Sequence, residues 1–228
     1  MQIWFTILSS VIFLVFGYII GSLNTSILYG KIFKKGDVRE HFSKNAGATN
    51  TNRVYGKKVA LTVLFVDILK TIFAVYIAFL LCWIFKTFYF DKNQDVLLFP
   101  LLAGLGVVIG HTFPVFFKFQ GGKGVASCIG LLFCFNPILL VAGAAIYIFI
   151  VWRSRYVSLA SILSGLIMIA LGYLPWIYDL WPLHHILNGV FWIDATIFSA
   201  GVLLMIALHH SNIKRLLNKS ENKLKFKN

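Results

Sequence analysis

The sequence is short of acidic residues. It holds eight Asp and Glu residues against 21 Lys and Arg residues, and charged residues make up only 13% of its 228 positions. So few acids leave no close carboxylate pair for acid–base work and little for a metal centre. Cysteine is scarce too, and Cys82, Cys128 and Cys134 show no metal-binding or redox spacing. We therefore predict no metal site and interpret the cysteines as small buried apolar residues.

Several catalytic motifs are also missing. No His is followed by four residues and then Asp, which excludes a common acyl-transfer box, and neither G-x-S-x-G nor H-E-x-x-H occurs. The G-G-K-G stretch at 121–124 is not a Walker A loop, because Gly124 takes the place of Ser or Thr and no Gly stands five residues before Gly122. A site in this chain would have to work mainly through hydrogen-bond donors and cations, which suits phosphates and oxyanions.

What the sequence has in abundance is apolar residues. They make up 59% of the chain, and the mean hydropathy is +0.82. The first basic residue is Lys31, so the apolar start predicts a retained membrane helix rather than a signal peptide. We predict an all-α integral membrane protein with one domain over residues 1–228 and seven membrane helices, at about 3–23, 59–85, 96–117, 124–135, 138–152, 157–176 and 190–208.

The distribution of positive charge predicts the topology. With seven spans, eighteen of the 21 Lys and Arg residues fall on one side, and only Lys86 and Lys92 fall on the other. The positive-inside rule then places the N-terminus outside and the C-terminus in the cytoplasm. The helices at 124–135 and 138–152 are short, and a re-entrant hairpin or one tilted helix are the alternatives. Merging these two helices into one span would put the last basic loops on the outer side of the membrane, against the positive-inside rule. The uneven distribution of Lys and Arg between the two sides of the membrane already explains the basic composition. Nucleic-acid binding is therefore not needed to explain it.

Polar clusters gather on the predicted cytoplasmic side. Glycines at 121–124 and the start of the next helix offer backbone N–H groups, and Lys123 adds a full charge, which together favour an anion. Residues 43–53 hold three Asn, hydroxyl side chains and two basic residues without an acid, a set that suits a phosphate ester. The alternatives are a tight turn with a snorkelling lysine and a solvated loop with helix caps.

Asp67 and Lys70 lie inside a predicted membrane helix. They are three residues apart and so share one helical face. Charges at this depth usually face a cavity or pair with each other. A self-satisfied structural pair is therefore the alternative to a functional one. Two further polar clusters, at 153–161 and 209–215, also fall on the cytoplasmic side.

These clusters together resemble the bacterial acyl-phosphate-dependent glycerol-3-phosphate acyltransferases. The resemblance covers the whole chain and rests on seven short motifs in order. They are GSLNTSILYGK at 21–31, D-x-R at 37–39, S-x-N-x-G-A-T-N-x-x-R at 43–53, D-x-x-K at 67–70, GHTFPVFFKFQGGKGVA at 110–126, RYVSLAS at 155–161, and H-x-x-N-I-x-R-L at 209–216 with Glu221 beyond.

The resemblance implies an enzyme of the bacterial plasma membrane, functional as a monomer among membrane lipids, with its active site on the cytoplasmic side and no cofactor. It would transfer a fatty acyl group from acyl phosphate to the 1-hydroxyl of glycerol 3-phosphate, the first acylation of phospholipid synthesis. The implied catalytic residues are Lys123, Ser158, His209 and Asn212. The implied substrate-binding residues are Lys31, Arg39, Ser43, Asn45, Arg53, Lys70, Gly122 and Gly124.

The sequence departs from the family pattern in places, and it leaves alternatives open. Phe42 and Lys44 stand where the family's first loop usually has glycines. Either His209 or the leaving phosphate could take the proton of the attacking hydroxyl. The competing function is a small membrane transporter for an anionic metabolite, which would share the intramembrane Asp67–Lys70 pair but should carry polar sites on both membrane faces. A structural membrane protein would need no such cluster of Asn and Gly.

Overall fold

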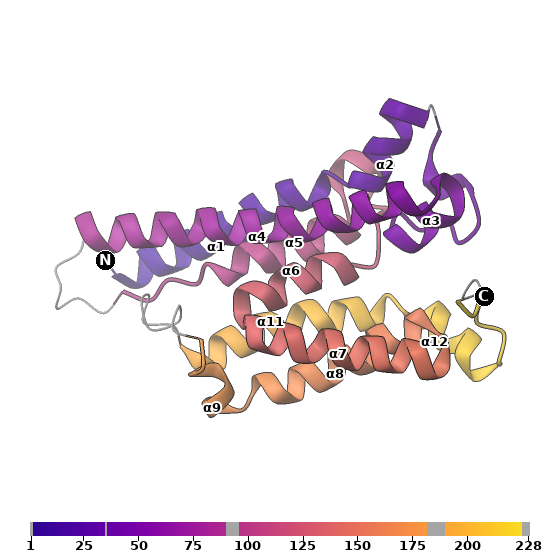
Figure 1. Cartoon of the computed structure of the whole chain (residues 1–228). Coiled ribbons are helices and arrows are strands. Elements are labelled where there is room, and N and C mark those ends of the chain that lie inside the picture. Colours follow the sequence, from indigo (N-terminus) through magenta and orange to yellow (C-terminus); the bar gives the residue numbers. More distant parts are fainter. Residues whose placement is uncertain (1, 35, 90–95, 182–189, 225–228) are drawn as a thin grey trace.

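The computed structural model describes residues 2–34, 36–89, 96–181 and 190–224. All of its regular elements in these ranges are helical (Figure 1). The α-helices are α1 Gln2–Ser22, α2 Thr25–Tyr29, α3 Ala48–Tyr55, α4 Lys57–Phe88, α5 Leu101–Thr112, α6 Val125–Phe135, α7 Pro137–Ser154, α8 Val157–Gly172, α9 Pro175–Tyr178, α11 Phe191–Ala207 and α12 His210–Leu217. A π-helix covers Gly30–Lys34, and short 3-10 helices cover Val38–Glu40 and Val115–Phe117.

Proline sets several helix boundaries that hydropathy alone places differently. The helix expected at 96–117 is α5, which begins after Pro100 and ends at Thr112, two residues before Pro114. The helix expected to reach 176 is α8, which ends at Gly172, and Pro175 begins the separate short helix α9. Proline fits the first turn of a helix but disfavours helical conformation in the residue before it. The polar segment at 24–58, between the first two predicted membrane helices, contains α2, the π-helix and α3.

Glycines allow α1 and α5 to pack with their backbones in close approach. A Cβ atom at Gly17 would lie 1.9 Å from the carbonyl oxygen of Ala103, and one at Gly106 would lie 2.2 Å from that of Leu14. Small residues at a helix interface are typical of membrane bundles, where close backbone packing replaces the hydrophobic effect. This contact fixes the end of α5, from which the glycine stretch at 121–124 continues.

The core of the remaining helices lies between α6 and α11. Phe135 and Phe198 are both fully buried, and their rings stack with centroids 5.0 Å apart. Leu131 packs in the same cluster with residues from α5, α7 and α8. The bundle has two groups of helices, one of α1, α4, α5 and α6 and one of α7, α8 and α11 (Figure 1). Contacts of α11 with α5 and α6 join the two groups.

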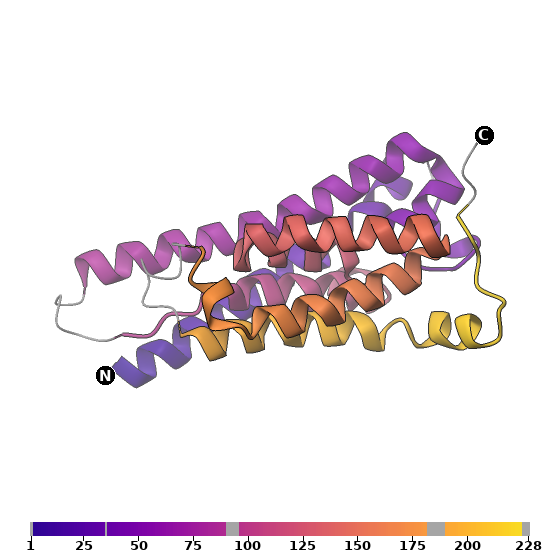
Figure 2. The same ribbon diagram turned by 60° about the horizontal axis from the view of Figure 1, so that its bottom comes forward.

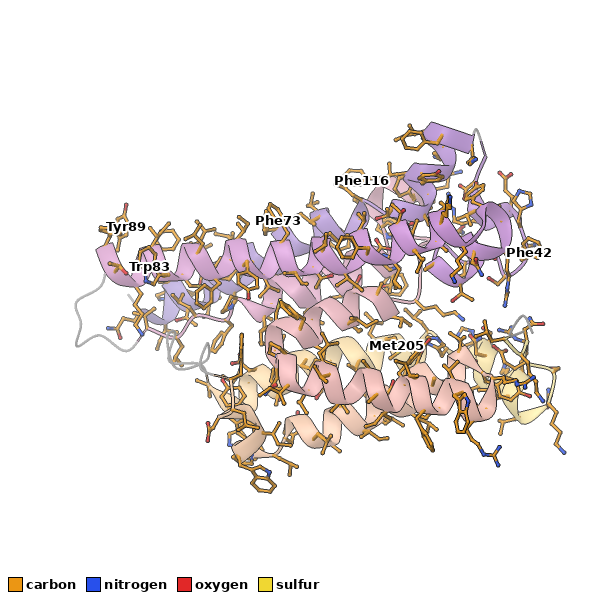
Figure 3. The ribbon with its side chains drawn as sticks, viewed as in Figure 1. Phe42, Phe73, Trp83, Tyr89, Phe116 and Met205 are labelled. Atoms are coloured by element: carbon orange, nitrogen blue, oxygen red, sulfur yellow. The ribbon has the colours of Figure 1, made fainter. Side chains whose placement is uncertain are left out.

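The outside of the bundle is apolar, as a lipid-facing surface requires. Phe73 and Trp83 of α4 and Tyr89, directly after this helix, lie on the outside (Figure 3), with 57%, 47% and 73% of their surface exposed. By length and composition, three helical segments of the described chain could cross a membrane, or four if the bent pair α11–α12 is counted as one span. The apolar helices α5, α6 and α8 are shorter.

Segments far apart in the sequence meet at one end of the bundle. Helices α3 and α12 both lie at the end remote from the start of α1, and two views agree on this (Figures 1 and 2). The glycine stretch at 121–124 follows α5 toward the same end. The polar clusters of the sequence therefore come together in space.

Candidate active site

A cavity of about 290 Å³ opens at this end of the bundle. Three separate parts of the chain line it. They are Ser43, Lys44 and Asn45 from the first loop; Thr112, Phe113, Phe119, Gln120, Gly121, Gly122 and Lys123 from the glycine loop and its approach; and Leu208, His210, Ser211 and Arg215 around the start of α12. The wall is thus polar and basic with an apolar part made of two phenylalanines and a leucine.

The glycine loop folds back on the end of α5. The N–H groups of Gly121 and Gly122 donate to the carbonyl oxygens of Thr112 and His111, at 3.1 and 3.0 Å. A Cβ atom at Gly121 would lie 2.0 Å from the oxygen of His111, so only glycine fits there. The end of α5 therefore already accepts the Gly122 N–H, and substrate binding by Gly122 stays a prediction.

The next two residues leave their N–H groups open. Gly124 has φ +83°, a left-handed conformation that glycine adopts without strain, and α6 begins directly after it. Within the part of the chain that the structure describes, no acceptor pairs with the N–H of Lys123 or Gly124. The first turn of α6 and this turn therefore form the anion-attracting end of a helix, within the stretch where the sequence predicts it.

Lys123 reaches from the glycine loop to α12. Its ammonium donates to the side-chain oxygen of Asn212. Burial and, to a smaller extent, the positive charges of Arg215 and Arg53 lower the pKa of Lys123 to about 8, against the opposing effect of Glu221. A lysine held in this way gains from an anion beside it, since a nearby negative charge favours the protonated form.

Glu221 ties the C-terminal segment to two helices. Its carboxylate accepts from Ser158 at 2.9 Å, from the Asn212 amide at 2.7 Å and from Arg215 Nε at 2.6 Å. Burial would raise the pKa of Glu221, but these three hydrogen bonds outweigh it and lower the pKa below its ordinary value. The N–H of Leu224 donates to Arg155, which holds the segment over the turn between α7 and α8. Ser158 and Asn212 are thereby oriented around Lys123.

His209 lies at the bend between α11 and α12, beside this cluster. Its Nδ1 lies 2.8 Å from the carbonyl oxygen of Met205, labelled in Figure 3. A carbonyl only accepts, so Nδ1 carries the hydrogen and Nε2 is left as the acceptor of the neutral ring. Burial and, to a smaller extent, the charge of Lys123 lower the pKa of His209 to about 4, against the opposing effects of the Met205 hydrogen bond and Glu221. His209 is therefore neutral near pH 7.

The first loop keeps an unusual backbone around Ser43. Phe42 and Lys44 have φ values of 48° and 56°, so both adopt the left-handed conformation for which the family's usual glycines are suited. Asn50 holds the loop by accepting from the Ser43 N–H and donating to the carbonyl oxygens of Val38 and His41. The Ser43 and Asn45 side chains line the cavity.

Three cations expected to bind substrate are engaged elsewhere. Arg39 pairs with Asp37 at 2.7 Å and donates to the carbonyl oxygens of Phe117 and Gln120. The Lys70 ammonium donates to main-chain oxygens at the end of α1, and Lys31 lies 5.2 Å from the centre of the Phe117 ring. None of the three lines the cavity, and of the other predicted site residues Arg53, Gly124, Ser158, His209 and Asn212 do not line it either. Substrate binding by Lys31, Arg39 and Lys70 stays a prediction; the contacts they make here brace the elements around the site.

Comparison with known proteins identifies the family. The profile of the glycerol-3-phosphate acyltransferase family matches residues 11–219. The chain belongs to this family. A glycerol-3-phosphate acyltransferase of Mycoplasmopsis synoviae is 43% identical over 229 residues and is covered completely, as is this chain. One of Bacillus velezensis is 38% identical, with 93% of this chain and 96% of that protein covered.

A solved structure agrees with this assignment. The crystal structure of PlsY, described as an integral membrane glycerol 3-phosphate acyltransferase in its glycerol 3-phosphate form, superposes with a TM-score of 0.71 at 31% identity. The match covers 95% of this chain and 96% of PlsY. The family resemblance predicted from the motifs is thus confirmed, and an enzyme replaces the transporter and structural alternatives.

Two residues of the candidate site escaped assignment from sequence. Arg215 stands within the last motif and Glu221 lies beyond it, but nothing in the sequence shows that Glu221 meets Ser158 across 63 positions. The available signal was that Glu221 is the lone acid in a basic tail. Among the described residues, no group of three or more His, Cys, Asp or Glu side chains could hold a metal ion.

Proposed function

We propose that this acyltransferase moves a fatty acyl group from acyl phosphate to the 1-hydroxyl of glycerol 3-phosphate. The products are lysophosphatidic acid and phosphate, and the reaction is the first acylation of bacterial phospholipid synthesis. Family membership supports the acceptor. The observation that carries the proposal is the Lys123 ammonium at the cavity, beside Arg215 and within range of the Arg53 charge. A cavity with this charge suits two phosphate-bearing substrates.

The donor is already activated, so no covalent enzyme intermediate is required. The glycerol hydroxyl attacks the acyl carbonyl carbon, a new C–O bond forms, and the bond to the phosphate oxygen breaks. Lys123 and the open N–H groups of Lys123 and Gly124 stabilise the negative charge of the phosphate. Ser43 and Asn45 supply further donors at the cavity wall. The substrates themselves thus carry the reacting groups, and the enzyme holds them in place.

The proton of the attacking hydroxyl passes to the leaving phosphate. When the acyl C–O bond breaks, the leaving phosphate oxygen takes the electron pair and becomes a full oxyanion, whereas burial lowers the pKa of His209 to about 4. The phosphate is therefore the stronger base of the two. His209 contributes as a neutral acceptor of a substrate hydroxyl through Nε2, because its Nδ1 hydrogen is held by Met205. Phe113, Phe119 and Leu208 give the acyl chain an apolar path out of the cavity.

A comparison of acyl donors tests the proposal. Purified protein in lipid vesicles, supplied with glycerol 3-phosphate, is expected to form lysophosphatidic acid from acyl phosphate and to release phosphate in equal amount. Acyl-CoA at the same concentration is expected to give no comparable rate, because the small basic cavity offers no nucleotide pocket. Equal rates with both donors, measured on the same preparation, would contradict the donor assignment. Omitting glycerol 3-phosphate is the control for hydrolysis of the donor.

The membrane arrangement belongs to the same proposal. We infer seven spans and one domain, with the N-terminus outside, the C-terminus in the cytoplasm and the cavity on the cytoplasmic side of the plasma membrane. The positions of α3 and α12 at the end remote from the start of α1 support this (Figure 2). Function as a monomer is part of the same proposal.

Cysteine labelling tests the topology. A Tyr89→Cys variant is expected to react with a membrane-impermeant maleimide in intact cells, whereas Lys219→Cys is expected to react only after the cells are opened. The native Cys82, Cys128 and Cys134 are all buried, so the unmodified protein serves as the unlabelled control. Labelling of both variants from the same side would overturn the arrangement.

The pH dependence of activity should report Lys123. Its ordinary pKa is lowered to about 8, and only the protonated form carries the charge that binds phosphate. We expect kcat/KM to be steady below pH 8 and to fall about tenfold per pH unit above it, because this quantity reports groups of the free enzyme. In Lys123→Arg the charge persists, so the alkaline fall should disappear. An unchanged fall in that variant would assign it to another group.

A further inference from the structure

A buried ionic cluster inside the bundle lies next to the glycine loop but outside the cavity. Asp67 and Lys70 of α4 pair at 2.8 Å, with 1% and 9% of their side chains exposed. Asp67 also accepts from Thr25 at 2.8 Å. The Nδ1 atom of His111, on α5, lies 3.2 Å from the Lys70 ammonium and 3.6 Å from the Asp67 carboxylate. The proposed chemistry uses none of these three titratable groups.

Lys70 connects three helices at this point. Besides Asp67, its ammonium donates to the carbonyl oxygens of Gly21 and Leu23, at 3.2 and 3.3 Å, where α1 ends. The Nδ1 atom of His111 thus faces both the Lys70 ammonium, which can donate to it, and the Asp67 carboxylate, which can accept from it. The cluster therefore sets the position of the His111 ring.

His111 in turn touches the glycine loop twice. Its carbonyl oxygen accepts the Gly122 N–H at 3.0 Å. Its ring packs against the same residue, because a Cβ atom at Gly122 would lie 2.2 Å from Nε2 and 3.0 Å from Cδ2. On the other side, Ala46 donates to the Gly121 carbonyl oxygen and Arg39 donates to that of Gln120. The residue before Lys123 is thus held between α5 and the first loop.

We propose that Asp67, Lys70 and His111 form a positioning unit that sets Gly122, and through it the Lys123 ammonium, for the acyl acceptor's phosphate. The unit does not line the cavity, so it acts through the glycine loop rather than on the substrate. His111 is the member in contact with the loop and is the positioning residue. This role rests on the proposed function of Lys123. It also accounts for a charged pair in a membrane helix, where such groups are otherwise unfavourable.

A double-mutant cycle between His111 and Gly122 tests the contact. Each single variant, His111→Ala and Gly122→Ala, is expected to lower kcat/KM by about 100-fold, since small misplacements of a binding group can cost this much. The double variant should lose little more than either single one, because removing the ring makes room for the new Cβ atom. Multiplication of the two losses would show that the residues act independently and would overturn the proposal.

Three further measurements separate positioning from general stability. His111→Asn keeps an acceptor for Lys70 and should retain activity within about tenfold of the wild type, although it lacks the ring. Binding of glycerol 3-phosphate, measured by calorimetry without an acyl donor, should weaken in His111→Ala, and the alkaline fall near pH 8 should move upward as Lys123 leaves its buried place. His41→Ala, an exposed histidine in the first loop, is the matched control.

The outcomes are distinct from those that test the acyl donor. If wild-type protein binds glycerol 3-phosphate but does not use acyl phosphate, the donor assignment fails, and the binding measurements still decide the role of His111. If His111→Ala does not fold, the comparison of Gly122→Ala with His111→Asn decides whether His111 positions the glycine loop. Wild-type binding and an unmoved pH profile in a folded His111→Ala or Gly122→Ala variant would show that the cluster only stabilises the bundle.

Discussion

The Lys123→Met variant is expected to lose about 10- to 150-fold in kcat/KM, because a charge-assisted hydrogen bond to a partly desolvated phosphate is worth about 1.5–3 kcal/mol. The loss grows if the charge acts mainly in the transition state. Methionine keeps the length and the apolar stem of the side chain, and the change leaves no buried charge unpaired. The variant should therefore insert and fold. Steady-state kinetics, normalised to membrane-inserted protein, measure the effect.

Lys118→Met is the matched control for this variant. Lys118 belongs to the same connection between α5 and α6, but it is exposed and does not line the cavity. An exposed lysine at the membrane surface contributes a few tenths of a kcal/mol to its interactions. Lys118→Met is therefore expected to change kcat/KM by less than about threefold. A similarly small change for Lys123→Met would mean that the glycine loop is not the phosphate site.

The Glu221→Gln variant is expected to lose about 10- to 150-fold in activity, on the scale of about 1.5–3 kcal/mol for a hydrogen bond to a charged group. Glutamine keeps the shape and can still accept from Ser158 and Asn212. It loses the charge that pairs with Arg215, and its NH₂ group would face the Arg215 donor instead. Asn212 would then hold Lys123 less firmly. Activity measured across pH, together with the melting temperature, separates this local effect from unfolding.

The pH profile of Glu221→Gln has a sign that can be worked out. Glu221 raises the pKa of Lys123, against the lowering by burial and by Arg215. Removing the carboxylate should therefore move the alkaline fall to lower pH, opposite to the shift expected for His111→Ala. Glu40→Gln, at an exposed acid of the first loop, is the control and should leave the profile unchanged. If the fall in activity at alkaline pH occurs at the same pH in Glu221→Gln as in the wild type, Glu221 does not influence the pKa of Lys123.

Hydropathy located the long helices well because membrane spans need long apolar runs. It missed α3, because Ala48–Tyr55 is a short polar helix held by tertiary contacts such as those of Asn50. The ends of α5 and α8 depended on Pro100, Pro114 and Pro175, which interrupt runs that remain apolar on both sides. Composition therefore predicts the existence of these helices better than their boundaries.

The site was predictable in its charge but not in its pairing. The sequence predicts that Arg39 and Lys123 lie on the cytoplasmic side and that Lys70 lies inside a membrane helix. Only the folded chain shows which of these cations protein acceptors already engage. The same limit applies to Gly122, whose N–H is taken by the end of α5. Glu221 could not be placed at all, because its partner Ser158 lies on another helix.

The most direct test of the account is a structure of this protein with glycerol 3-phosphate bound. The account predicts that the phosphate lies in the cavity between the first loop, the glycine loop and α12, with an oxygen in hydrogen-bond contact with the Lys123 ammonium and the open N–H of Gly124. A phosphate bound elsewhere, such as at Arg153 and Arg155 on the turn after α7, with Lys123 still bonded only to Asn212, would contradict it.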